Sequence, residues 1–188
     1  VTASCVVTAY PVSYFLAFHA GCYRTVWLLL AALPFWTSYL LRVCAWKIVL
    51  AYNGVLNSLL TGAGLLASPS LAFLNTPAAV VVTLAHAYAP FAILPIFTAL
   101  ESMPRSLFEA AADLGARPFT PFRLVVLPYS IKGVLAAVTV VFIPTVGDYV
   151  TPALVGGPNS IMLGSRIQVQ IVRAYDWPFE AALSVALM

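Results

Sequence analysis

Side chains that could do chemistry are few in this chain, and three of them lie close together. Arg105, Glu109 and Asp113 follow one another at four-residue intervals, so on a helix they share one face. Leu107 and Leu114 mark an apolar face of the same short helix. A helix with charged side chains on one face and apolar ones on another is suited to contact with another protein.

The same stretch predicts a turn after this helix. Gly115 can adopt the left-handed conformation that ends a helix, and Pro118 cannot continue it. Thr120 can cap a new helix that has Pro121 at its first position. We therefore predict that the loop 101–122 holds a short helix outside the membrane, joined by a tight elbow to the base of a membrane helix.

Periodicity alone leaves two interpretations of the short helix open. The small residues Ala110–Ala112 would let a partner approach closely, and Glu109 would give that contact a polar rim. The alternative is an amphipathic helix that lies on lipid, although its polar face lacks the lysines typical of such helices.

The elements around the loop are predicted to be membrane helices. Of the 188 residues, 62% are hydrophobic and only 8% are charged, against about 25% charged in a soluble domain. A soluble protein with a very large core is the alternative. In hydrocarbon the main chain must pair its own polar groups, and the apolar runs do not alternate as barrel strands do. We predict an all-α, polytopic helical membrane protein.

Apolar runs of about 20 residues mark the expected spans. We expect four of them, at about 1–23, 25–41, 77–100 and 122–143. The segment 53–76 is rich in Gly, Asn, Ser and Pro and is predicted to be an extramembrane loop with short helical pieces. We interpret 1–188 as a single transmembrane domain, and as a fragment that lacks the first helix and the end of the last.

Asp148 is the carboxylate of most interest outside the loop. It follows Pro144 and Gly147, which we expect to interrupt the fourth spanning helix near its outer face. Ionisable residues near membrane depth are functional candidates, and with aromatic neighbours Asp148 could guide a cation along a substrate pathway. Those aromatic residues are Tyr149, Trp36 and Trp46. The alternative is a carboxylate that is simply hydrated in an external loop.

The histidine of the third span and the three cysteines are interpreted as structural residues. His86 in the third span could be a protonation or substrate site, but a lone histidine more often hydrogen-bonds a neighbouring helix. Cys5, Cys22 and Cys44 lack metal-ligand spacing and are interpreted as packing residues. We expect no metal site.

Several function classes are disfavoured. The net charge of +3 comes with nine scattered Lys and Arg residues, not with the basic stripe that nucleic acid requires. The chain has no HExxH or GxSxG motif, so a membrane enzyme is a poor match. A secondary transporter driven by an ion gradient would be expected to carry carboxylates within its spans, where almost none occur.

The loop resembles a known motif. Glu109–Ala111, three residues, Gly115, nine residues and then Val-Val-Leu-Pro at 125–128 are similar to the EAA loop of permease subunits of binding-protein-dependent ABC importers. Longer stretches resemble the spermidine/putrescine-type permeases of that group, so the resemblance covers nearly the whole chain. These stretches are 28–46, 142–157 and 177–187. Lys132 and Glu180 depart from the residues usual in the family.

This resemblance implies a type I ABC importer permease (MetI-like) fold and a cytoplasmic EAA coupling loop. The loop would dock on an ATP-binding cassette subunit, through residues that the resemblance assigns to this contact. They are Glu109, Ala110, Ala111, Asp113, Leu114, Gly115, Leu127 and Pro128. The permease itself would hydrolyse nothing and hold no cofactor, because ATP is bound by the partner subunit.

The resemblance also implies the remaining partners and the location. They are a homologous second permease subunit, a periplasmic or extracellular solute-binding protein, a polyamine as the small-molecule substrate, and the lipid of the bacterial inner membrane, with no nucleic acid. Ferric iron, thiamine, sulfate or an opine are alternative solutes, because permeases for these share the loop.

Overall fold

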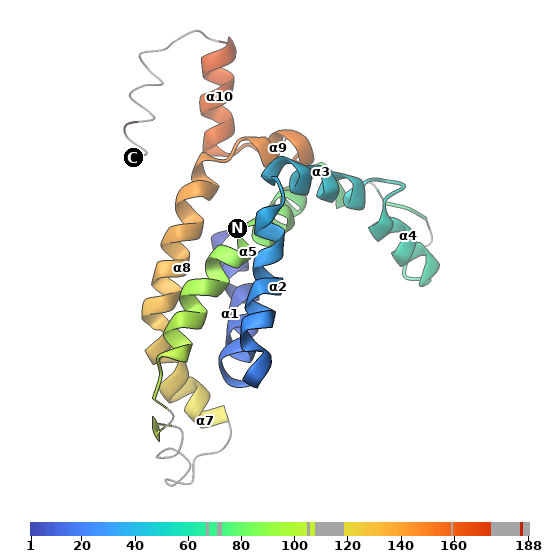
Figure 1. Cartoon of the computed structure of the whole chain (residues 1–188). Helices are drawn as coiled ribbons and strands as arrows, with labels where there is room; N and C mark the ends of the chain where they lie inside the picture. The colour runs from blue at the N-terminus through green and yellow to red at the C-terminus, as the bar shows by residue number, and fades with distance from the viewer. Residues whose placement is uncertain are drawn as a thin grey trace. The chain divides into compact units, whose positions relative to one another are not determined.

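The computed structural model of the chain describes residues 1–66, 68–70, 73–104, 106–107, 119–158, 160–173 and 185. Regular structure in this part of the chain is entirely helical, which confirms the all-α prediction (Figure 1). The helices are α1 (Thr2–Phe18), the 3-10 helix η1 (Gly21–Tyr23), α2 (Arg24–Trp36), α3 (Tyr39–Leu50), α4 (Val55–Gly62), α5 (Pro77–Glu101), α7 (Phe119–Pro121), the π-helix η3 (Phe122–Val126), α8 (Leu127–Gly147), α9 (Val150–Val155) and α10 (Leu163–Arg173).

Three segments of the described chain are long and apolar enough to cross a membrane. They are Tyr39–Gly62, Pro77–Glu101 and Phe122–Gly147. A fourth segment is long and apolar enough only if two helices are counted together. These are Thr2–Phe18 and Gly21–Trp36, which turn by 120° at the break between them. The third and fourth expected spans are thus confirmed as α5 and as η3 with α8.

The first two expected spans need correction. The predicted helix at 1–23 ends at Phe18, and Gly21 then takes a φ of 49° in the left-handed region that glycine tolerates. The predicted helix at 25–41 ends at Trp36, because Ser38 is extended at φ −55° and ψ 135° and starts α3. Helices of 17 and 13 residues are each short for a span, and apolar composition alone did not reveal these breaks.

The expectation for 53–76 was also incomplete. The segment contains α4, as predicted, but α4 and α3 together form an apolar stretch long enough to cross. At the turn between them, a side chain on Gly54 would come within 2.4 Å of the carbonyl oxygen of Ile48. Asn57 is buried and fixes the segment: its amide donates to the carbonyls of Ala51 (3.1 Å) and Ser70 (2.9 Å).

The chain divides into two compact units. Unit 1 consists of Val1–Trp36 and the described part of Tyr88–Phe142; unit 2 consists of the described parts of Thr37–Ala87 and Ile143–Met188. The expectation of one permease domain over 1–188 stays a prediction.

Unit 1 is built on the close approach of α5 and α8, which lie side by side (Figure 1). Gly133 on α8 leaves so little room that an added Cβ would meet the Cβ of Ala99 at 2.5 Å and the carbonyl oxygen of Pro95 at 2.7 Å. Polar bonds join α1 to both helices. The Ser13 hydroxyl donates to the carbonyl of Ile93 at 3.0 Å, and the hydroxyls of Tyr10 and Ser130 are 2.9 Å apart.

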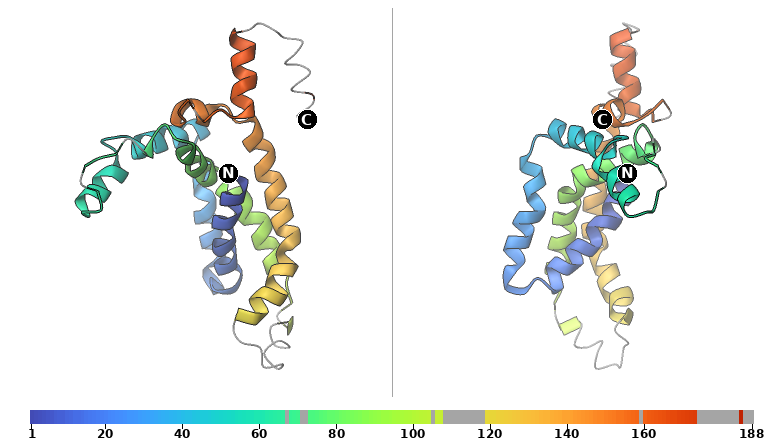
Figure 2. Two further views of the ribbon diagram at one scale, coloured as in Figure 1. Left: turned by 180° about the vertical axis from the view of Figure 1, so that it is seen from behind. Right: turned by 90° about the vertical axis from the view of Figure 1, so that its right-hand side faces the viewer.

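Unit 2 has a small apolar core where α9 packs on α3, as Figure 2 shows from two sides. The buried residues of this core are Val43, Leu50, Ala79 and Val155. Partly buried side chains that pack against it are Tyr39, Trp46, Leu56, Phe73, Leu74 and Leu154.

Two local expectations at the ends of the fourth span are wrong. Pro144 does not interrupt the helix, because α8 continues through it, although the helix does end at Gly147 as expected. Thr120 does not cap the helix either, since α7 already begins at Phe119. Pro144 has no N–H for the carbonyl of Val140, and membrane helices tolerate such a loss because local adjustments and neighbouring groups satisfy the freed carbonyl.

We predict that Gly133→Ala destabilises the protein, because its methyl group would collide with α5. The expected loss is about 1–3 kcal/mol of unfolding free energy, as for other overpacked contacts. Thermal unfolding in detergent measures it. Gly62→Ala is the matched control, since nothing lies within 4 Å of its added Cβ. Equal midpoints for both variants would contradict the close packing of α5 on α8.

Candidate functional site

The motif of the coupling loop lies mostly outside the described residues. Glu109, Ala110, Ala111, Asp113, Leu114 and Gly115 are in this group, so their predicted contact with an ATP-binding subunit stays a prediction. The structure does describe Leu127 and Pro128, and it describes both segments from which the loop departs. We call these segments the loop base: the end of α5 with Glu101 and Ser102, and 119–132 at the start of the following helix.

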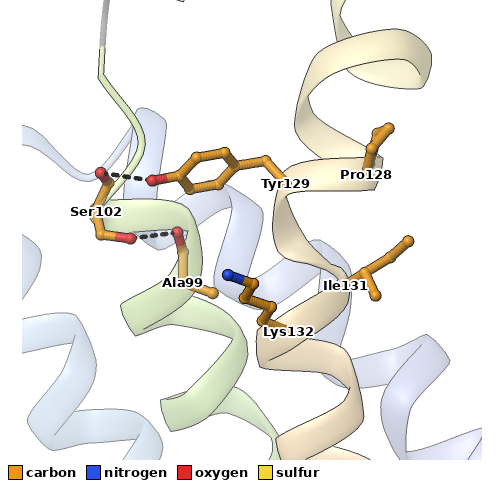
Figure 3. Close-up of a pocket in the computed structure, with 6 residues that line it drawn as sticks. All are labelled: Ala99, Ser102, Pro128, Tyr129, Ile131 and Lys132. Carbon is orange, nitrogen blue, oxygen red and sulfur yellow. Dashed lines mark hydrogen bonds between the residues drawn. The ribbon is translucent and has the colours of Figure 1, made fainter.

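Hydrogen bonds hold the two sides of the loop base together. The Tyr129 hydroxyl donates to the carbonyl of Ser102 at 3.1 Å, and the Ser102 hydroxyl donates to the carbonyl of Ala99 at 2.9 Å (Figure 3). The Tyr129 bond therefore joins the start of the loop 101–122 to the helix that follows it.

A third helix, α2, also contacts the loop base. Arg24, the first residue of α2, forms an ion pair with Glu101, and its guanidinium carbon lies 5.4 Å from the centre of the Phe97 ring. Both charged side chains are more than a third exposed, so water screens the pair and its contribution to stability is small. The ion pair matters for position, because it holds the start of α2 beside the end of α5.

The helix after the loop begins in an unusual form. Phe122–Val126 is a π-helix, in which the Leu127 amide donates to the carbonyl of Phe122, five residues earlier. Pro128 has no N–H for the carbonyl of Leu124, four residues before it, and this loss weakens the ordinary α pattern there. Leu127 and Pro128 are both exposed in the first turn of α8. The sequence analysis missed the π-helix, although Pro128 was its available signal.

Aromatic rings on α1 hold the π-helix. The Phe122 ring meets Tyr10 edge to face at 6.1 Å and Tyr14 edge to face at 5.5 Å between centroids. Such pairs add about 0.5–1.5 kcal/mol each beyond their buried area. Together with the Tyr10–Ser130 bond, they tie the beginning of this helix to α1 on both sides of the π segment.

Asp148 occupies a different setting, in unit 2, and it is only 7% exposed. One carboxylate oxygen accepts hydrogen bonds from the amides of Val150 (3.0 Å) and Thr151 (3.3 Å) at the start of α9. The other accepts from the Thr151 hydroxyl at 2.8 Å and from the Tyr39 hydroxyl of α3. The interpretation as a carboxylate simply hydrated in an external loop is therefore wrong.

Through these bonds the Asp148 side chain caps the first two amides of α9, whose N-cap residue is Tyr149, and links α9 to α3. The sequence held a signal for this role, since aspartate is favoured just before a helix and Pro152 is typical of a first turn. The partners Tyr39 and Thr151 were not foreseen. Of the aromatic residues expected near Asp148, Tyr149 follows it in the chain and is 44% exposed, and Trp46 packs on the core of unit 2. Trp36 belongs to unit 1, where it is 79% exposed.

His86 hydrogen-bonds a neighbouring helix, as the sequence analysis favoured. The indole N–H of Trp46 on α3 donates to Nδ1 of His86 on α5 at 3.1 Å. An indole nitrogen can only donate, so Nδ1 must be the acceptor and the ring proton of neutral His86 lies on Nε2. Protonation of the ring would place two donors against each other. The contact therefore disfavours a proton-carrying role.

Arg42 binds two main-chain carbonyls in unit 2. Its guanidinium donates to the carbonyl of Thr37, where α2 gives way to α3, at 3.2 Å, and to that of Ala87 on α5 at 2.8 Å. Its fixed role in joining α3 to α5 depends on a chain break that the sequence did not reveal.

Comparison with known proteins adds the family. The family described as "Binding-protein-dependent transport system inner membrane component" matches residues 9–188. The spermidine/putrescine transport system permease protein PotB of Haemophilus influenzae is 36% identical over 186 residues, covering 99% of this chain and 65% of that protein. PotB of Escherichia coli K12 is 35% identical over 186 residues, covering 99% and 67%.

A third relative carries no solute in its name. The inner membrane ABC transporter permease protein YdcU of Escherichia coli K12 is 36% identical over 198 residues, covering 98% of this chain and 62% of that protein. The chain thus spans 62–67% of the length of these three relatives. With the apolar helices, these matches confirm the expected localisation as a multi-pass protein of the bacterial inner membrane.

We predict that Asp148→Ala lowers stability by about 2–4 kcal/mol, because it removes the carboxylate that accepts from two amides at the start of α9 and from the hydroxyls of Tyr39 and Thr151. Asp148→Asn should cost less, since the amide oxygen can still accept from the Val150 and Thr151 amides. Thermal unfolding of the two variants in detergent tests the difference. Unchanged midpoints with altered transport would instead mark Asp148 as a substrate-binding group.

Proposed function

Because this chain belongs to the family of binding-protein-dependent transport system inner membrane components, we propose that it is a permease subunit of an ATP-driven importer for polyamines. In this proposal it forms part of the translocation pathway and takes up spermidine or putrescine. The observation that carries the proposal is the similarity, along nearly the whole chain, to relatives named as spermidine/putrescine permeases.

ATP would be bound and hydrolysed in partner subunits, and this chain would take up their movement through its EAA loop. The spacing from Glu109 to Pro128 supports this step, because a fixed interval links the motif to the helix that follows it. The described loop base supports it as well. A force on the loop reaches α5 and α8 together, since Tyr129 bonds across to Ser102 at 3.1 Å.

The contacts of the loop base suggest how the movement spreads. Arg24 carries it from Glu101 to α2, and the Phe122 ring carries it to Tyr10 and Tyr14 on α1. The close contact at Gly133 keeps α5 and α8 from sliding past each other. Unit 1 would then move as one body, which is what alternating access by rigid rocking requires.

The proposed partners follow from this division of work. They are ATP-binding cassette subunits on the cytoplasmic side, a homologous second permease subunit, and a solute-binding protein outside the membrane. The cargo is the least constrained part, because YdcU is about as similar to this chain and its name specifies no solute. Ferric iron, thiamine, sulfate or an opine are the alternative cargoes.

Asp148, Tyr149, Trp36 and Trp46 remain proposed residues of the substrate pathway. The buried bonds of Asp148 suit an indirect part, in which its charge acts over a distance while its oxygens hold α9. Exposed Tyr149 and Trp36 are better suited to direct cation–π contact with an amine.

We predict that Glu109→Lys and Gly115→Val abolish uptake while membrane insertion stays intact. The first reverses a charge at the docking contact, and the second puts a branched side chain where the elbow is predicted to need a left-handed residue. Uptake of labelled spermidine into vesicles, with ATP supplied to the complete transporter, measures the effect. Lys47→Gln is the control, since Lys47 is exposed and remote in sequence from the loop.

Two outcomes would contradict the proposal at different levels. Uptake that persists without ATP, or with the loop deleted, would remove the coupling role. ATP-dependent uptake of ferric iron, thiamine or sulfate in place of spermidine and putrescine would leave the coupling role intact and replace only the cargo.

A further inference from the structure

An open pocket of about 580 Å³ lies at the loop base in unit 1. Its described lining comes from the last turn of α5 and the first turns of α8. The residues are Ala99, Ser102, Pro128, Tyr129, Ile131 and Lys132. In Figure 3 the Tyr129 ring and the Lys132 side chain both extend from α8 toward the end of α5, where Ala99 and Ser102 lie.

Lys132 is the hydrogen-bond donor that this lining leaves available. The hydroxyl hydrogens of Tyr129 and Ser102 are engaged with main-chain carbonyls. Lys132 is exposed, and within the described ranges no carboxylate forms an ion pair with it. An ammonium group has three donors and strongly favours an anionic acceptor.

The remaining walls of the pocket are apolar. The side chains of Ala99, Pro128 and Ile131 contain only carbon, and Ile131 is 49% exposed on a helix apolar enough to span a membrane. A ligand that satisfies the whole pocket would therefore join an anionic group to an apolar body. Basic pockets between membrane helices are known sites for anionic lipid head groups on the cytoplasmic side.

We propose that this pocket binds an anionic phospholipid, with its phosphate on Lys132 and the upper part of its acyl chains against Ile131 and Pro128. The inference rests on the proposed function in one respect, since the cytoplasmic orientation of the loop assigns the pocket to the cytoplasmic leaflet. Tyr129 fits this level of the membrane, because its ring is amphipathic and such rings gather at lipid head groups.

The charge of Lys132 favours an anionic phospholipid over the other ligands that could enter this pocket. A polyamine is cationic and is repelled by Lys132. A zwitterionic lipid carries a phosphate as well, but it brings its own ammonium close to Lys132. Free phosphate would meet one available donor and would gain nothing from the apolar walls.

The test uses the complete transporter in nanodiscs of phosphatidylcholine with a small share of phosphatidylglycerol. Native mass spectrometry counts the lipids that stay bound to the permease. We expect Lys132→Gln to reduce the preference for phosphatidylglycerol about fivefold, the factor expected for one basic side chain near an anionic surface. Arg123→Gln is the matched control, because Arg123 is exposed on the same helical segment and is not among the described residues of the pocket.

Three results would overturn the proposal: an unchanged preference in Lys132→Gln, an equal loss in Arg123→Gln, or displacement of the lipid by millimolar inorganic phosphate. The Glu109→Lys variant separates this proposal from the transport proposal. It should lose uptake and keep the lipid preference, since Glu109 belongs to the loop and not to the pocket lining. Loss of the preference in Glu109→Lys would also count against the pocket.

Discussion

The main chain of this protein must satisfy its own polar groups, because hydrocarbon offers no water to do so. Long helices meet this constraint without help, as α5 and α8 do. The breaks need polar side chains, and unit 2 supplies one for each of three described breaks. Arg42 bonds the carbonyl of Thr37, Asn57 closes the segment from Ala51 to Ser70, and Asp148 caps α9. These three polar residues of unit 2 thus allow the backbone to turn.

Unit 1 meets the same constraint with fewer irregular segments. Its helices associate through a glycine contact, hydroxyl-to-carbonyl bonds and edge-to-face rings. These are the short-range interactions available where apolar surface gains nothing from burial, since lipid is as apolar as the side chains. The result is a tightly joined frame beneath the loop. Such a frame is suited to passing on a displacement without absorbing it.

The sequence predicted the parts of the fold that depend on length and composition. The spans α5 and α8 follow from apolar runs, because about 20 apolar residues have few other stable arrangements. The breaks at Gly21 and Ser38 were not predictable from hydropathy, since the residues on both sides are equally apolar. For the site, the loop motif was recognisable from spacing alone. The predicted role of Asp148 in a substrate pathway stays a prediction. Its bond to Tyr39 joins residues more than a hundred positions apart, and its bond to Thr151 folds back within one turn. A single sequence does not display such contacts.

The π-helix overlaps the nine-residue interval that separates Gly115 from Val125. A π segment is an α-helix that has accommodated an additional residue, and one residue of an α-helix corresponds to about 100° of rotation. The wider turn at Phe122–Val126 takes up the additional residue, so the turns on either side of it keep the mutual orientation of a plain α-helix. A residue added within a plain α turn has no such outlet and rotates everything beyond it by about 100°. The chain between the motif and α8 therefore contains one place where its length can change by a residue without a change of direction.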